Sequence, residues 1–400
     1  MSSELRELWG HAGGQLPDEW GITPLESLLR DNKSIAVGVM YPGPDTPGGT
    51  PLLKVGDIKG GVAMRPSYCI SAETDEEHKR TKLVGDELLI TLVGNPGECI
   101  VVKPEMAGWN PARAIAVVRL KDPSLRTYLK TVLESPAGRH LIDAVLNTTV
   151  QKTLNLKDVR KLPIPMPTDA EIEGISSISE ALTNRITLLR ETNTTLEAIA
   201  QALFKSWFVD FDPVRAKMEG RAPEGMDEAT AALFPNGFEE SELGLVPKGW
   251  RVDSAYTVTQ IIYGSPFASK KFNTESLGIP LIRIRDLRDE SPGVFTPEEH
   301  PKGYLVQPGD IVVGMDGEFR AYLWGGEEAW LNQRVCVFVP KPGFPAAYVH
   351  RSIMPLLAAV EASETATTVI HLGKNDIDRF RVPVPDKRAL AAFGHIADDL

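Results

Sequence analysis

Arginine, lysine and side-chain amide groups gather at a few predicted turns and strand ends of this chain, and their chemistry suits contact with nucleic acid. A guanidinium can hydrogen-bond to guanine or hold a phosphate, and an Asn or Gln amide can pair with adenine. In the second half of the chain the candidates are Tyr263, Ser265, Lys270, Lys271, Arg283, Arg285, Arg288, Arg320, Asn332, Gln333 and Arg334. In the first half they are Lys54, Lys59, Asn95, Asn110 and Arg113. For each residue alone, a solvated surface charge or a turn residue is the alternative.

Local patterns place some of these candidates. Arg283 and Arg285 lie two residues apart in a predicted strand, so alternation puts both side chains on one face. The turn at residues 263–265, together with Lys270 and Lys271, predicts a loop that contacts phosphate. The expected contacts therefore come from a strand face and a loop of the second half.

The sequence lacks the motifs that catalysis on DNA would require. An adenine methyltransferase needs an Asn/Asp-Pro-Pro-Tyr/Phe motif, and Phe211–Val214 lacks its second proline and its aromatic residue. Gly60-Gly61 and Gly325-Gly326 are lone glycine pairs rather than a cofactor loop. Asp310 with Glu318 imitates a nuclease pair, but Asp310 follows Pro-Gly, which favours a turn. We therefore predict no catalytic residue, no cofactor and no metal.

Composition and charge bound the class of protein. The chain has 400 residues, of which 42% are hydrophobic and 24% charged, which is typical of a globular protein with room for two or three domains. No apolar run is long enough for a membrane span, and no signal peptide is expected, so the predicted location is cytoplasmic. The three cysteines are too few and too scattered for a disulfide framework or a zinc site, which favours buried apolar use.

Positive and negative charges are distributed unevenly along the chain. The net charge of −11 argues at first against a nucleic-acid partner. Residues 50–166, however, carry more Lys and Arg than Asp and Glu, and the acidic excess lies in the remaining segments. A local basic patch matters more for binding than the total.

Two strand-rich regions repeat one another, and they must position the candidate residues. The collinear matches are Leu16–Trp20 with Val246–Trp250, Pro51–Ile58 with Pro280–Leu287, Val84–Ile90 with Pro308–Val313, Trp109–Val118 with Trp330–Val339, and Leu162–Pro165 with Val382–Pro385. They pair Asp86 with Asp310, and Trp109 with Trp330. Arg113 is then the counterpart of Arg334. The sequence thus indicates an internal duplication.

A long helix is predicted over residues 168–208, between the two copies. Thr168 and Glu171 form a capping-box pattern at its start. A heptad pattern follows, and its seam includes Ile175, Leu182, Leu189, Asn193, Leu196, Leu203 and Trp207, with Phe208 beside it. About 40 residues make a helix on the order of 60 Å long, which needs a partner along its seam. A long amphipathic core helix is the alternative interpretation.

The predicted fold class is α+β, with two similar, mixed, strand-rich domains separated by long coiled-coil helices as a pseudo-twofold repeat. The expected domains are 1–167 and 249–385, with the helix at 168–209, a linker at 210–248 and the start of a second, shorter helix at 386–400. Trp207 and Phe208 are predicted to lie against a protein partner or the opposing helix. Similar domains on a rigid spacer suit a ligand with two sites at fixed spacing, and DNA is such a ligand.

The sequence resembles the DNA-specificity subunits of Type I restriction–modification systems. The residues that carry the resemblance are Leu162–Pro167, Ala202–Val214, Gly225–Asp227, Leu233–Pro235 and Glu242–Trp250. The resemblance implies two target recognition domains, each of which reads one half of a bipartite, asymmetric double-stranded DNA target. It also implies helices similar to the conserved spacers of that family, although the second helix here is short.

The partners follow from the resemblance. It implies docking of two methyltransferase subunits, which use S-adenosylmethionine, and of restriction or motor subunits, which use ATP and Mg. The chain itself would be non-catalytic, and some of the candidate residues would contact DNA. The alternatives are a truncated or half-type specificity protein acting as a dimer, a protein-only coiled-coil adaptor and a stand-alone DNA-modifying enzyme.

Overall fold

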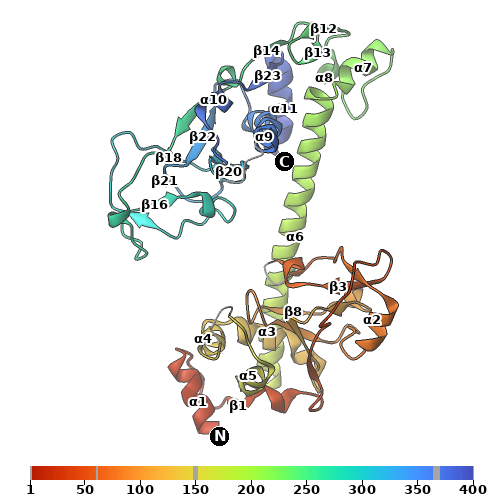
Figure 1. Cartoon of the computed structure of the whole chain (residues 1–400), viewed down its shortest axis with the longest axis vertical. Helices are drawn as coiled ribbons and strands as arrows, with labels where there is room; N and C mark the ends of the chain where they lie inside the picture. Colours follow the sequence, from red (N-terminus) through yellow and green to blue (C-terminus); the bar gives the residue numbers. More distant parts are fainter. Residues whose placement is uncertain (1, 60–61, 147–151, 364–369, 400) are drawn as a thin grey trace. The chain divides into compact units, whose positions relative to one another are not determined.

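The computed structural model describes residues 2–59, 62–146, 152–363 and 370–399, and it confirms the α+β class (Figure 1). The chain divides into two compact units, Met1–Glu191 and Thr192–Leu400, and each is strand-rich. The long helix α6 (Asp169–Phe208) is one continuous element that contributes to both units. In the part of the chain that the structure describes, no helix is long and apolar enough to cross a membrane.

The first unit is built on small sheets flanked by short helices. Its helices are α1 (Ser2–His11), α2 (Ala72–Glu77), α3 (Arg126–Glu134), α4 (Pro136–Ala144) and α5 (Leu156–Lys161). Its strands are β1 (Gly21–Pro24), β2 (Ile35–Val37), β3 (Thr50–Leu53), β4 (Ile58–Lys59), β5 (Val62–Ala63), β6 (Cys69–Ile70), β7 (Leu88–Thr91), β8 (Cys99–Val101), β9 (Asn110–Pro111), β10 (Ile115–Val118) and β11 (Pro163–Met166). The main sheet has the order β2-β10-β7-β8, and its apolar residues pack on α3.

The second unit uses the same plan. Its helices are α7 (Asp212–Met218), α8 (Glu228–Ala232), α9 (Ala346–Ser363), α10 (Lys374–Ile377) and α11 (Lys387–Asp399). Its strands are β12 (Phe238–Ser241), β13 (Gly244–Pro247), β14 (Arg251–Ser254), β15 (Thr259–Tyr263), β16 (Ile279–Ile282), β17 (Phe295–Thr296), β18 (Leu305–Val306), β19 (Ile311–Gly314), β20 (Ala321–Leu323), β21 (Ala329–Leu331), β22 (Val335–Pro340) and β23 (Arg381–Val384). The main sheet has the order β15-β22-β19-β20.

The main strand pairings of the first unit recur in the second. The antiparallel pair β1–β11 matches β14–β23, and the parallel pair β3–β9 matches β16–β21. Leu52 pairs with Asn110 in the first unit, and its counterpart Leu281 pairs with Trp330 in the second. Asn110, rather than Trp109, is therefore the structural counterpart of Trp330.

Backbone hydrogen bonds extend this one-residue correction to the turn before β10 and β22. The N–H of Arg113 donates to the carbonyl of Val39. The same bond in the second unit joins Gln333 to Ser265. The counterpart of Arg113 is therefore Gln333, and the expected pairing with Arg334 was wrong by one position.

The acidic residue ahead of β7 and β19 is also shifted. Glu87 accepts a hydrogen bond from the N–H of Val84 at 3.1 Å, and Asp310 accepts one from Gln307 at 2.9 Å. Both carboxylates close a turn onto a backbone N–H three residues earlier, which is the usual capping geometry of a short acidic side chain. Glu87, and not Asp86, is thus the counterpart of Asp310.

Residues 210–248 are folded onto the second unit, although their composition indicates a linker. They contain α7, α8 and the antiparallel hairpin β12–β13. Phe211, Val214 and Phe234 are buried in the main core of this unit, and the Phe211 ring lies 5.7 Å from that of Trp250. Buried aromatic side chains fix this segment despite its many Pro, Gly and acidic residues.

Helix α6 begins and ends as its sequence predicts. Thr168 and Glu171 form the capping box, with the N–H of Thr168 2.8 Å from Oε2 of Glu171. At the other end Trp207 and Phe208 are buried, and their rings lie 6.0 and 5.1 Å from Phe393 of α11. The second helix therefore packs on the last turns of α6 within the second unit.

One glycine in each unit lets two backbone segments touch. A Cβ added at Gly38 would lie 1.9 Å from the carbonyl oxygen of Pro111. A Cβ added at Gly264 would lie 1.8 Å from the carbonyl oxygen of Asn332. Only glycine permits this approach, which sets the position of the turn before β10 and β22.

We expect Gly264→Ala to lower the free energy of unfolding of the second unit by about 3 kcal/mol, because the new methyl group meets backbone that cannot move aside. The matched control is Gly293→Ala, since a Cβ at Gly293 would meet nothing within 4 Å. Its effect should stay within about 0.5 kcal/mol. Urea unfolding of the full chain, followed by circular dichroism, measures both. Equal midpoints for the two variants would contradict the constraint.

Candidate nucleic-acid interface

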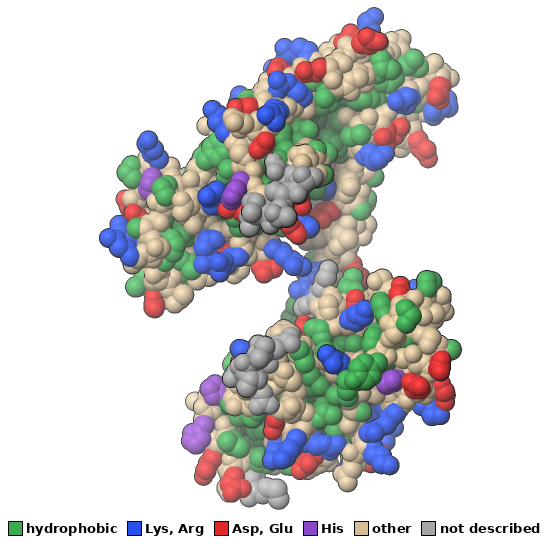
Figure 2. Space-filling model, viewed as in Figure 1, with side chains coloured by type: hydrophobic (Ala, Val, Ile, Leu, Met, Phe, Trp, Pro, Cys, Tyr) green, Lys and Arg blue, Asp and Glu red, His purple; other side chains and the backbone are tan. Residues whose placement is uncertain are grey.

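The exposed candidates lie on turns and loops beside the sheets. They are Asn95 and Arg113 in the first unit, and Lys270, Lys271, Arg285, Arg288, Arg320, Gln333 and Arg334 in the second. Figure 2 shows Lys and Arg side chains spread over each unit and interspersed with Asp and Glu. On the face shown, contact with a polyanion would thus come from individual loops rather than from one broad basic surface.

Several candidates of the second unit have structural roles instead. Ser265 is buried, and its hydroxyl donates to the carbonyl of Lys302 at 2.9 Å. Tyr263 is the last residue of β15 and is partly buried. The half-buried Asn332 lies at the close approach of Gly264. The residues at 263–265 therefore continue a strand into a packed crossing, and they do not form the predicted phosphate loop.

Arg283 and Arg285 do not share a strand face, because the strand ends first. β16 ends at Ile282, and residues 284–286 form a 3₁₀ turn. The Asp286 carboxylate accepts the backbone N–H of Arg283 at 3.0 Å and its guanidinium at 2.9 and 3.0 Å. These hydrogen bonds raise the pKa of Arg283 and commit its side chain, whereas Arg285 is exposed.

In the first unit the candidates also divide into structural and exposed groups. Asn110 is fully buried, and its amide is bonded to Asp75 at 3.2 Å and to Thr81 at 2.7 Å. Lys54 Nζ lies 3.3 Å from the ring centroid of Tyr68, which is a cation–π contact. Lys59 ends β4, and its side chain lies outside the described residues. Asn95 Nδ2 lies 3.3 Å from Glu98, and Arg113 is exposed.

Three exposed cations of the second unit have acidic partners at the surface. Lys271 lies 3.3 Å from Glu298, and Arg320 lies 2.8 Å from Glu318. Arg334 lies 3.5 Å from Asp316. Exposed pairs of this kind are worth at most about 1 kcal/mol, so a stronger anionic or polar ligand can displace them.

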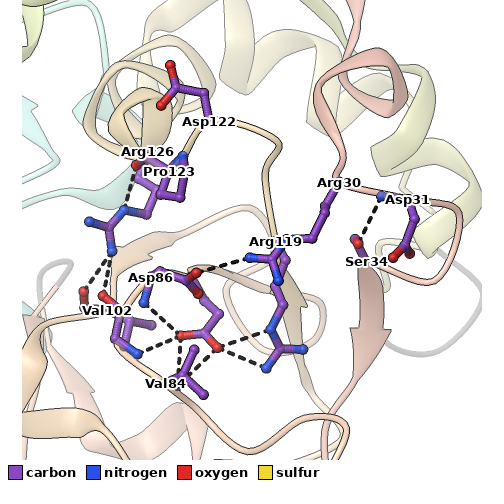
Figure 3. A network of polar contacts seen from close by, with 12 residues as sticks. Arg30, Asp31, Ser34, Val84, Asp86, Val102, Arg119, Asp122, Pro123 and Arg126 are labelled. Carbon is purple, nitrogen blue, oxygen red and sulfur yellow. Dashed lines mark hydrogen bonds and ion pairs between the residues drawn. The ribbon is translucent and has the colours of Figure 1, made fainter.

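Much of the positive charge of the first unit is used internally (Figure 3). Glu87 is fully buried and accepts N–H groups of residues 84–86 at 3.0–3.1 Å. Arg119 donates to Glu87 at 2.8 and 3.2 Å, and Arg126 donates to three backbone carbonyls. Arg30 lies 3.0 Å from Asp86. The basic excess of residues 50–166 thus overstates the charge available to a ligand.

Two residues beside Arg334 were not predicted from the sequence. Asp316 and His371 lie together, with His371 Nδ1 2.6 Å from Asp316 Oδ1. Asp316 follows β19, whereas His371 is 55 residues away and carries no sequence signal of its own. Only the fold brings the pair to Arg334.

The seam of α6 forms a second candidate surface, for protein rather than DNA. Leu182, Ile186 and Leu189 are exposed, by 61%, 49% and 48%. Asn193 is also exposed, whereas Ile175, Leu196 and Leu203 are partly covered. A cavity of about 530 Å³ lies beside this helix in the first unit, lined by Met106, Trp109, Thr183, Thr187 and others. Exposed leucine and isoleucine in a row are typical of an interaction face.

The structure offers little for catalysis within the residues it describes. No group of three or more His, Cys, Asp or Glu side chains there is placed to hold a metal ion. Cys99 and Cys336 are fully buried, and burial raises the pKa of both thiols to about 12. Both therefore stay protonated at neutral pH and act as apolar core residues, as predicted.

Comparison with known proteins confirms the resemblance. The chain is 36% identical over 137 residues to the specificity subunit of the Type I restriction enzyme EcoBI from Escherichia coli, which covers 34% of this chain and 29% of that protein. It is 30% identical over 236 residues to the specificity subunit of the Type I restriction enzyme HindI from Haemophilus influenzae, covering 49% and 46%. The chain thus spans less than half the length of these curated relatives. No family model matches the chain.

A solved structure shows the fold. The crystal structure of the S subunit of a Type I restriction–modification system from M. genitalium superimposes with a TM-score of 0.50 at 14% sequence identity. The match covers 96% of this chain and 90% of that chain. Two strand-rich units with a long helix between them are therefore the fold of a known specificity subunit.

We expect Glu87→Ala to lower the free energy of unfolding of the first unit by about 3–5 kcal/mol, because it leaves the guanidinium of Arg119 and several N–H groups unpaired. The matched control is Asp86→Ala, which breaks only the half-exposed pair with Arg30 and should cost no more than about 1 kcal/mol. Calorimetric unfolding of the full chain measures both. Equal losses would mean that the buried network is not what stabilises this unit.

Proposed function

We propose that this protein is a non-catalytic, sequence-specific DNA-binding subunit of a Type I restriction–modification complex. The observation that carries the proposal is the repeat of one fold in a chain whose curated relatives are specificity subunits. Exposed arginine, lysine and amide groups on the turns of both units supply donors for base edges and phosphates.

In this proposal the two units read different halves of a bipartite target. Their main strand pairings match, but the residues at equivalent turn positions differ. Arg113 corresponds to Gln333, and the half-buried Ala114 corresponds to the exposed Arg334. Different side chains on the same backbone favour different bases, so the two halves of the target would be unlike. The continuous helix α6 would set the gap between the halves.

The proposed partners bind along α6. Its exposed seam residues suit burial against a methyltransferase subunit, and a complete complex would hold two such subunits together with restriction or motor subunits. Methylation with S-adenosylmethionine, and motion with ATP and Mg, would belong to those partners. The same seam also suits a second copy of this chain, which is the half-type alternative.

Selection of duplexes from a random DNA pool with the full chain tests the proposed recognition. We expect two short conserved sequence blocks of unequal composition, separated by a gap of fixed length. Binding should weaken as salt rises, because phosphate contacts release counterions. Failure to enrich any sequence, with normal assembly of the protein complex, would favour the protein-only adaptor.

We expect the double variant Leu182→Ser/Leu189→Ser to reduce recovery of the co-expressed methyltransferase subunit more than tenfold, because two apolar side chains lose their burial. DNA binding by the chain alone should not change. The matched control is Leu188→Ser, since Leu188 is 54% exposed but lies off the seam. Affinity pull-down and light scattering provide the measurement. Conversion of a dimer to a monomer, with methyltransferase recovery intact, would instead support the half-type alternative.

A further inference from the structure

Three polar side chains from separate segments meet at one end of the main sheet of the second unit. Asp316 follows β19, Arg334 precedes β22, and His371 lies before α10. Asp316 Oδ1 lies 2.6 Å from Nδ1 of His371 and 3.5 Å from Nη1 of Arg334. The N–H of Leu372 donates to the carbonyl of Met315 at 2.8 Å, which holds the histidine segment beside the loop.

The backbone at Arg334 is in an unfavourable conformation. Its φ is 71°, in the left-handed region that glycine adopts without cost and that a residue with a Cβ rarely adopts. Its side chain is 59% exposed, that of His371 56%, and that of Asp316 24%. Strain kept at an exposed arginine, where glycine would relieve it, indicates that the side chain has a use.

The first unit has the same backbone at this place without the polar group. The N–H of Leu92 donates to the carbonyl of Ala114 in the first unit, as Met315 donates to Arg334 in the second. Val93 bridges to Thr153 where Asp316 bridges to His371. The positions of Asp316, Arg334 and His371 are thus occupied by Val93, Ala114 and Thr153.

We propose that Arg334 reads a guanine base in the half-target of the second unit, oriented by Asp316, which His371 in turn holds. The inference rests on the proposed DNA recognition and names the residue that gives one half its specificity. An arginine reads guanine with two N–H donors directed at O6 and N7. Asp316 is the only partner of the Arg334 side chain among the described residues, and the contact is made by Nη1. The Nε–Nη2 edge of the guanidinium therefore keeps two donors for a base.

Charge favours a base edge over a phosphate at this position. A carboxylate 3.5 Å from the guanidinium repels a second anion brought to the same group. A guanine edge is neutral, and it accepts hydrogen bonds from the guanidinium without that repulsion. Because the first unit has Ala114 at the equivalent position, it lacks a counterpart of this contact, and the guanine requirement that Arg334 imposes should appear at one position of one half only.

The test is selection from a random DNA pool, with the full chain and its variants, followed by binding titrations on the selected duplex. Arg334→Gly removes the side chain and suits the left-handed backbone, so its melting temperature should equal or exceed that of the unaltered protein. We expect it to reduce discrimination for guanine at one position of one half by roughly ten- to a hundredfold, with the other positions unchanged. Arg334→Lys should lose nearly as much, since it keeps the charge but not the two-pronged geometry.

A positioning variant and a control complete the test. Asp316→Asn should weaken the same guanine preference by a smaller factor and leave the other positions alone. Arg379→Ala removes another exposed arginine of this unit and should leave the selected sequence unaltered. Loss of affinity for all sequences alike, with a shallower salt dependence, would identify a phosphate contact and overturn the inference.

The outcomes also separate this inference from the proposed function. If the unaltered chain selects a sequence and Arg334→Gly selects the same one, the inference fails while DNA recognition stands. If the unaltered chain selects no sequence, both fail.

Discussion

The close approach of two backbone segments at one turn decides where the exposed side chains of each unit lie. In the second unit Gly264 packs against the carbonyl of Asn332, and the N–H of Met315 bonds to Arg334 from the other side. These contacts restrict the conformation of the turn. Gln333 and Arg334 are therefore carried by a constrained backbone rather than by a flexible loop. The first unit builds the same turn with Gly38. Rigid placement of donors is what discrimination between bases requires, because a misplaced donor loses its hydrogen bond.

Electrostatics then separates the cations that stabilise the fold from those that can meet a ligand. The carboxylates of Glu87 and Asp286 sit inside turns and bind arginine from within. Arg119 and Arg283 therefore stabilise turns of the fold, and their charges are neutralised by these carboxylates. By contrast Lys271, Arg320 and Arg334 are exposed, and their acidic partners lie near the surface. Net charge is therefore a poor guide to which arginines can bind a ligand, and the partner of each arginine is a better one.

The sequence predicted the main secondary-structure elements well, but it did not predict the residue-by-residue correspondence between the two units. The duplication, the capping box of α6 and the α+β class follow from patterns that span many residues. The counterpart of Arg113 does not, because a one-residue insertion leaves the pattern of a turn unchanged and moves every side chain by one place. The prediction that Arg283 and Arg285 share a strand face was wrong, because the strand ends at Ile282 and the carboxylate of Asp286 caps the turn that follows. His371 could not be found at all, since its partner is distant in the chain and only the fold joins them.

In the proposed complex, helix α6 would couple DNA recognition to subunit assembly for a physical reason. Its last turns are fixed by the aromatic contacts of Phe204, Trp207 and Phe208, whereas Leu182 and Leu189 are exposed. An isolated helix gains little from propensity alone, so its middle depends on whatever covers those side chains. A protein partner bound on the seam would both bury these side chains and stiffen α6, which contributes to both units. The spacing between half-targets would then be most strictly fixed in the assembled complex, in which the partner subunits would act on the recognised DNA.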